Sequence, residues 1–172
     1  MSQAAAVNGA HKSTLPAYVV EVAPKLGFGD PPGLTLFHQL SSVGVAGIRE
    51  VRVGALYEIR GRLSPSQMHH LCRELLCDPI TQDYRIDTST ASTAFLIGPH
   101  WRVEVWLKPQ VTDPVGETVR KAVADLGLPE PESVRAGTAY QLLGRIARPQ
   151  ADRIVRSLLA NPVIHMTRIS QT

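Results

Sequence analysis

Two cysteines and six histidines are among the side chains of this 172-residue chain that could serve as nucleophiles, bases or metal ligands. Cys72 and Cys77 stand five positions apart on a predicted helix, about 140° around its axis, so they do not share a face as a redox or metal pair. Cys72 falls on the apolar stripe of that helix, which predicts a buried small hydrophobe. No histidine and acid are spaced to activate it as a nucleophile.

The other polar motifs also predict no active site. His69 and His70 adjoin on the same helix, and no H-x₃-H or C-x₂-C pattern occurs, so we expect surface or partner-contacting histidines and no zinc site. Residues 27–33 are rich in glycine but lack the order of a phosphate loop. The sequence D-P-x-G at 30–33 and 113–116 predicts a helix start, with a bound phosphate or carboxylate as the open alternative. We therefore expect no catalytic, cofactor-binding or metal-binding residue.

Composition and charge narrow the class of protein. The chain is 44% apolar, which predicts a folded core, and no window approaches the ~18 apolar residues of a membrane helix. With two cysteines and no visible secretory signal, we expect a cytoplasmic protein. The net charge of +3 lies in the second half. There we expect a solvated face, or second an acidic protein partner, at Arg145, Arg148, Arg153 and Arg156. Few aromatic residues accompany this charge, so we expect no nucleic-acid partner.

An internal repeat determines the organisation of the chain. Residues 18–86 align with 101–169 at an offset of 83 without a gap, and 22 of the 69 pairs are identical. The identities fall on turn and cap residues, which indicates a tandem duplication. We therefore expect a flexible N-terminal tail (1–17), a first repeat (18–86), a linker (87–99) and a second repeat (100–172).

Each repeat is expected to contain the elements β-α-β-β-α-β. Alternation at 101–108 predicts a strand, and Asp113–Pro114 predicts a helix start that runs to Gly127. Residues 133–145 predict two strands that bend at Gly137, as do 50–62 at Gly54. A second helix begins near 64–65 or 148–149, and a last strand covers 80–86 or 163–169. A unit of ~70 residues is marginal alone, so we expect the repeats to pack sheet to sheet or edge to edge as a pseudo-dimer.

The motifs that recur in both repeats resemble landmarks of the PurS family, the small subunit of phosphoribosylformylglycinamidine synthase. In the second repeat they are V-E-V-W-L-K-P-Q-V-T-D-P-V-G-E-T-V (103–119), V-R-A-G (134–137) and L-L-A-N-P-V-I (158–164). The first repeat contributes V-E-V (20–22), D-P-P-G (30–33), V-R-V-G (51–54) and D-P-I-T-Q-D-Y (78–84). The family usually has a lysine after V-R-x-G, where this chain has Ala55 and Thr138, and its usual member is a single self-associating unit.

The resemblance implies an α+β fold, related to the ferredoxin-like fold, and a role in the purine-synthesis step that forms formylglycinamidine ribonucleotide. It implies a non-catalytic subunit of an ATP-dependent ligase, which bridges a large synthetase subunit and a glutaminase subunit. ATP, Mg²⁺ and glutamine would be used by the complex, with no cofactor on this chain and self-association as a possibility. The expected structural or interface residues are Asp30, Gly33, Arg52, Gly54, Asp113, Gly116, Arg135, Gly137 and Trp106.

Two other functions stay open at this point. Duplicated β-α-β-β-α-β units also resemble regulatory domains that bind a small molecule, such as an amino acid, at the repeat interface. A weaker alternative is an enzyme that acts alone through an unrecognised site.

Overall fold

The computed structural model describes residues 15–87 and 99–172, so the expected tail and linker lie almost wholly outside the described residues. Each repeat contains three strands and two helices. The first is built from β1 (Ala17–Pro24), α1 (Pro31–Gln39), β2 (Ile48–Arg60), α2 (Pro65–Leu71) and β3 (Gln82–Asp87). The second is built from β4 (His100–Leu107), α3 (Pro114–Asp125), β5 (Ser133–Gly144), α4 (Arg148–Ile154) and β6 (His165–Gln171). A 3₁₀ turn (Leu40–Val43) follows α1, and one π turn extends α2 (Cys72–Leu76) and α4 (Val155–Leu159).

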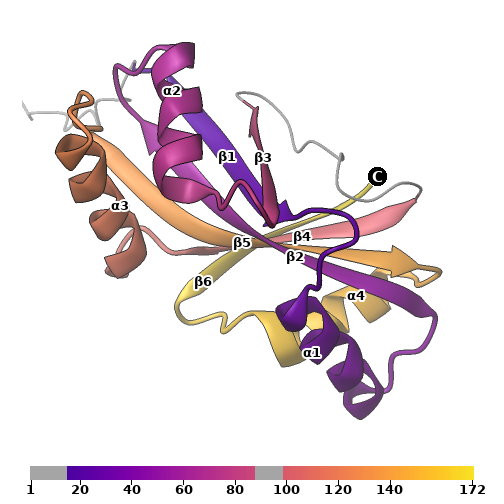
Figure 1. Ribbon diagram of the computed structural model, residues 1–172. Coiled ribbons are helices and arrows are strands. Elements are labelled where there is room, and N and C mark those ends of the chain that lie inside the picture. The colour runs from indigo at the N-terminus through magenta and orange to yellow at the C-terminus, as the bar shows by residue number, and fades with distance from the viewer. Residues whose placement is uncertain (1–14, 88–98) are drawn as a thin grey trace, which may run out of the picture.

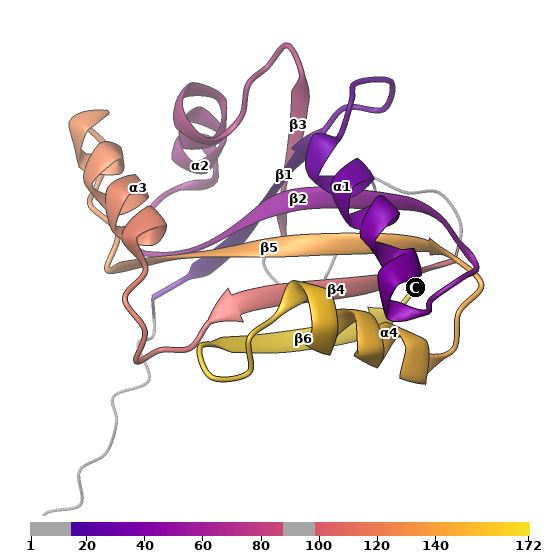
Figure 2. The same cartoon turned by 90° about the horizontal axis from the view of Figure 1, so that it is seen from below.

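All six strands form one antiparallel sheet in the order β3-β1-β2-β5-β4-β6. The four helices lie on one side of it (Figures 1 and 2). The expected α+β class and the pairing of two repeats are therefore confirmed, and the repeats join edge to edge through β2 and β5. Among the described residues, no helix is long and apolar enough to cross a bilayer.

The two strands expected at the centre of each repeat are one continuous strand in the structure. β2 has 13 residues and β5 has 12, and the expected bends at Gly54 and Gly137 do not interrupt either strand. Neither glycine has a positive φ. The strands stay continuous because each pairs with the other along nearly its whole length. Each repeat therefore has the β-α-β-β-α-β order only if the two halves of its long strand are counted separately.

The register between the long strands follows a pseudo-two-fold axis. Tyr57 pairs with Ala136. Their equivalents at the offset of 83, Tyr140 and Val53, pair with each other in the same way. Contacts made by one repeat therefore recur in the other unless the side chains differ. A pairing of this kind is isologous, as in a symmetric homodimer.

The long strands carry the first helix of each repeat to the other repeat. α1 packs beside α4 in a core that contains Leu36, Val103 and Ile154, and α3 packs beside α2 in a core that contains Val20, Leu71 and Val123. Figure 2 shows these two helix pairs over opposite ends of the sheet. Each core is therefore built from residues of both repeats.

The face of the sheet without helices has a small apolar cluster and a buried polar cluster. Leu56, Trp106 and Ala139 pack together with the half-buried Val19 and Met166. Trp106 lies on the face opposite Val103 and Val105, as the alternation of its strand predicts.

Candidate functional site

The duplicated D-P-x-G sequences anchor the first helix of each repeat to the long strand beside it. One Asp30 oxygen accepts from the Gly33 amide at 2.8 Å, and the other accepts from the Val53 amide at 2.7 Å. In the second repeat, Asp113 accepts in the same way from the amides of Gly116 at 2.8 Å and Ala136 at 2.6 Å. The chain's own carboxylate thus occupies the place that an anion would take at each helix N-terminus.

Gly33 and Gly116 are the residues that let helix and strand approach. A Cβ on Gly33 would lie 2.4 Å from the carbonyl oxygen of Val51, and one on Gly116 would lie 2.4 Å from that of Val134. Both glycines are buried. Their recurrence therefore has a steric cause, close backbone approach.

Arg52 and Arg135 bind the carbonyl group at the end of a neighbouring strand. Arg52 donates from Nη2 to the oxygen of Pro24 at 2.5 Å, and Arg135 donates to that of Leu107 at 3.1 Å. Arg135 also lies 3.5 Å from Glu58 of the other repeat and over the ring of Trp106. The two arginines hold strands together within the described chain.

Gly54 and Gly137 lie where a neighbouring strand comes close. A Cβ on Gly137 would lie 2.6 Å from the ring of Trp106, and one on Gly54 would lie 3.0 Å from the oxygen of Val22. Close approach, and not the expected bend, therefore accounts for these two glycines.

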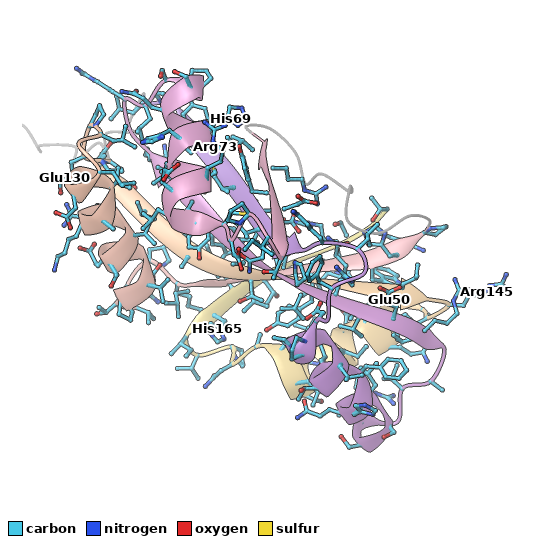
Figure 3. The ribbon with its side chains drawn as sticks, in the orientation of Figure 1. Glu50, His69, Arg73, Glu130, Arg145 and His165 are labelled. Carbon is cyan, nitrogen blue, oxygen red and sulfur yellow. The ribbon has the colours of Figure 1, made fainter. Side chains whose placement is uncertain are left out.

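Among the described residues, Cys72 lies in the core, whereas His69 and His165 lie nearer the surface in separate places. Cys72 is fully buried, as its place on the apolar stripe predicts, and burial raises its pKa to about 12. His69 lies on α2 with Nδ1 3.0 Å from the hydroxyl of Tyr84, and Figure 3 shows His165 in a different part of the molecule. Within residues 15–87 and 99–172, no three histidine, cysteine or acidic side chains gather as a metal site.

Two shallow hollows meet where the repeats join, on the helix side of the sheet. One, of about 560 Å³, includes Phe28 and Pro31 in its wall, and the other, of about 510 Å³, includes Pro114 and Val115. Both contain Ala55 and Thr138 in the floor. The sequence motifs predict the helix starts that lie beside these hollows, but they do not predict that the two hollows adjoin.

Several apolar side chains remain exposed around these hollows and elsewhere on the surface. Phe28 is 45% exposed and Val115 is 52% exposed. Ile80 and its equivalent Val163 are both 73% exposed, each just before the strand that closes its repeat. In the part of the chain that the structure describes, the other large exposed hydrophobic residues are Leu26, Leu34, Leu75 and Ile164. Scattered exposed residues are ordinary, but apolar side chains gathered at a hollow, such as Phe28 and Val115, are typical of sites that contact other proteins.

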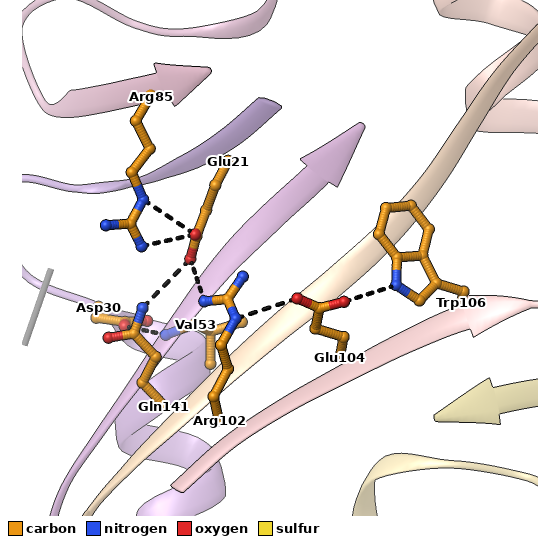
Figure 4. Close-up of polar contacts among 8 residues, drawn as sticks. All are labelled: Glu21, Asp30, Val53, Arg85, Arg102, Glu104, Trp106 and Gln141. Carbon is orange, nitrogen blue, oxygen red and sulfur yellow. Dashed lines mark hydrogen bonds and ion pairs between the residues drawn. The ribbon is translucent and has the colours of Figure 1, made fainter. Parts of the chain in front are cut away.

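A buried cluster of charged side chains joins the repeats on the opposite face (Figure 4). Glu21 accepts from Arg85 at 2.7 Å, from Arg102 at 3.0 Å and from the Gln141 amide at 3.2 Å. Arg102 also donates to Glu104 at 3.1 Å. Arg102 is therefore shared by two glutamates that occupy the same position in the two repeats.

The charges in this cluster compensate one another. Burial alone would lower the pKa of Arg102, but the hydrogen bonds and charges of Glu21 and Glu104 raise it overall. Arg102 is 2% exposed and Glu21 is 4% exposed. The cluster was not predicted from the sequence, where its only signal is a glutamate within each apolar V-E-V segment.

Comparison with known proteins gives a family and similar solved structures. The sequence profile of PurS, phosphoribosylformylglycinamidine (FGAM) synthase, matches residues 17–90 and again 100–172. A solved structure of Methanocaldococcus jannaschii PurS, described as one of the subunits of formylglycinamide ribonucleotide amidotransferase in the purine biosynthetic pathway, is similar at 25% identity and a TM-score of 0.40. The match covers 44% of this chain and 96% of the Methanocaldococcus jannaschii chain. No protein of curated function matches. The two matched segments span most of the sequence, and the chain therefore belongs to the PurS family, with two copies of the family's unit in tandem.

Proposed function

We propose that this chain is a non-catalytic assembly subunit of glutamine-dependent phosphoribosylformylglycinamidine synthase in de novo purine biosynthesis. It bridges a large ATP-using synthetase subunit and a glutaminase subunit in the cytoplasm. The other subunits use ATP, Mg²⁺ and glutamine. Membership of the PurS family supports the place in purine biosynthesis, and the bridging role rests on the contacts described above.

One observation carries the bridging role. Asp30, Arg52 and their equivalents in the second repeat are occupied by contacts inside the chain, while apolar side chains at the two hollows stay exposed. Asp30 and Asp113 accept backbone amides, and Arg52 and Arg135 donate to backbone carbonyls. Such residues stabilise a scaffold, whereas exposed apolar side chains favour a protein partner.

The hollows give a second candidate, a small-molecule sensor with its site at the repeat boundary. An amino acid in such a site needs partners for its carboxylate and its ammonium group. The acidic side chains in the walls, Asp30 and Asp113, already accept two amides each. The walls therefore favour apolar side chains of a partner polypeptide over a charged small ligand.

Co-purification from the native host tests the proposal. The tagged chain is expected to retain two larger proteins, and mass spectrometry identifies whether they are the synthetase and the glutaminase. Phe28→Asp and Val115→Asp should weaken this retention, because each places a charge in the wall of a hollow. Leu34→Asp, at a residue that is 58% exposed outside both hollows, is the matched control.

The sensor function predicts a different result. Glutamine, ATP or another small molecule at 100 times its dissociation constant would stabilise the isolated chain by about 2.7 kcal/mol. A rise in melting temperature that corresponds to this free energy, measured without partner proteins, would favour the sensor function. Retention of neither larger protein would contradict the assembly function.

A further inference from the structure

The buried charged cluster differs between the repeats although the strands that carry it are equivalent. Glu21 and Glu104 recur. Arg102 of the second repeat corresponds to Val19, and Gln141 corresponds to Glu58. Arg85 of the first repeat also binds Glu21, but the second arginine and the neutral amide that bind it come only from a second repeat.

The isologous register shows what would happen if two first repeats paired through β2. Each Glu21 would keep Arg85 of its own repeat. It would find Val19 of the other copy in place of Arg102, and Glu58 in place of the Gln141 amide that donates to it at 3.2 Å. A second carboxylate would thus lie beside a buried one. Glu58 would keep Arg60 of its own repeat, but neither glutamate would have Arg102, so the arrangement is unfavourable.

A pair of two second repeats would have a packing defect and no unfavourable contact between carboxylates. Leu56, which is fully buried in the cluster with Trp106, corresponds to Ala139. Paired second repeats would place Ala139 where Leu56 packs, once on each side of the axis. The missing side-chain atoms would leave a cavity beside each Trp106, and such cavities destabilise a core.

We propose that the pairing surface of each repeat selects the other repeat and rejects a second copy of itself. Glu58 and Val19 exclude pairs of first repeats, and the Leu56 position excludes pairs of second repeats. This specificity prevents like repeats of two different chains from pairing with each other. It is independent of the proposed role in purine synthesis.

The test uses full-length protein with a protease recognition sequence placed within residues 88–98. After cutting, both halves are kept together, unfolded in denaturant, refolded and weighed by native mass spectrometry, which distinguishes all pairs by mass. We expect only first–second pairs. Like pairs that together equal the unlike pairs would mean random association and would overturn the proposal.

A designed variant tests the named charges. Val19→Arg with Glu58→Gln gives the first repeat the residues of the second, so pairs of first repeats should appear. His70→Arg with Glu74→Gln makes the same charge change on exposed residues and should leave only unlike pairs. If the first variant also gives only unlike pairs, these side chains do not set the specificity.

Gln141→Glu examines the same contact in the intact chain, should the double variant fail to refold. It places a second carboxylate beside Glu21, so the melting temperature should fall at neutral pH. The difference from the parent should shrink toward about pH 4, where carboxylates take up protons. Gln110→Glu, at an exposed position, is the matched control. An equal effect of both changes at every pH would overturn the contribution of Gln141.

Discussion

Ala55 and Thr138 pair directly across the long strands, and they are the same position of the two repeats. The pseudo-two-fold axis therefore passes between them, at the floor of the two hollows. In this chain the axis is lined by a methyl group and a hydroxyl-bearing side chain, and the pair is formed within one polypeptide.

The first prediction concerns stoichiometry. If a large synthetase subunit binds a pair of single PurS units, it should bind one copy of this chain, because the chain supplies both units. Native mass spectrometry of the reconstituted complex measures the ratio. Two copies of this chain per large subunit would contradict the idea that the repeats act as a covalent pair.

The second prediction concerns the isolated halves. Residues 1–87 contain α1 without the α4 it packs against, and 99–172 contain α3 without α2. Each half alone should therefore show no cooperative thermal unfolding, while an equimolar mixture should. Circular dichroism during heating measures both. A cooperative transition in either half alone would show that the exchanged helices are dispensable for folding.

The third prediction concerns the approach of helix and strand. Gly116→Ala should destabilise the protein by about 1–3 kcal/mol, as overpacking of a core does, because the new Cβ meets a backbone oxygen at 2.4 Å. Gly29→Ala is the control, since a Cβ there has no neighbour within 4 Å among the described residues and the position has no positive φ. Urea denaturation gives both free energies. Equal values for the two variants would disprove the steric cause.

The fourth prediction concerns the shared arginine. Arg102→Met should cost about 3–5 kcal/mol, because it leaves two buried glutamates without their common partner. Adding Glu21→Gln should recover part of the loss. Arg120→Met, which removes exposed pairs with Glu117 and Glu130, should change the melting temperature little. No recovery in the double variant would mean that Arg102 acts through packing alone.

The fifth prediction concerns the buried thiol. The pKa of Cys72 is raised to about 12 from 9.0 by burial, so the unfolded chain loses this proton at lower pH than the folded chain. Stability should therefore fall as pH rises from 9 toward 12. Tyr57 and Tyr140, whose pKa values burial also raises, add to the fall at the upper end.

Cys72→Ala separates the thiol from the tyrosines. The difference in unfolding free energy between about pH 8 and about pH 10 should be smaller in this variant, because Cys72 then no longer titrates in the unfolded chain. In the native parent, iodoacetamide should modify Cys72 only after unfolding, as mass spectrometry would show. Rapid modification of the folded protein would contradict the burial of this thiol.

Local features were predictable from the sequence, while contacts between distant segments were not. The helix starts at Asp30 and Asp113, and the burial of Cys72, follow from spacing and neighbours within a few residues. The continuity of the long strands could not be predicted in this way, because a glycine within a strand pattern is compatible with both a bend and close packing.

The exchange of first helices and the buried charged cluster have weaker signals in the sequence than the helix starts have. Periodicity predicts which face of α1 is apolar but not which strand receives it. Arg102 and Glu21 are 81 positions apart, and nothing near either residue identifies the other. Only the duplication itself, through the fixed offset of 83, connects residues at such a distance.

The exchange of helices also has a consequence for synthesis on the ribosome. When residues 15–87 have emerged, α2 and β1 still lack α3, which completes their core. At the same stage α1 lacks α4 and the strands of the second repeat, against which it packs. Their apolar faces stay open to water until most of the chain has been translated. Multi-element units of this kind are vulnerable to aggregation during that interval, so the nascent first repeat is the stage at which chaperone binding should be strongest.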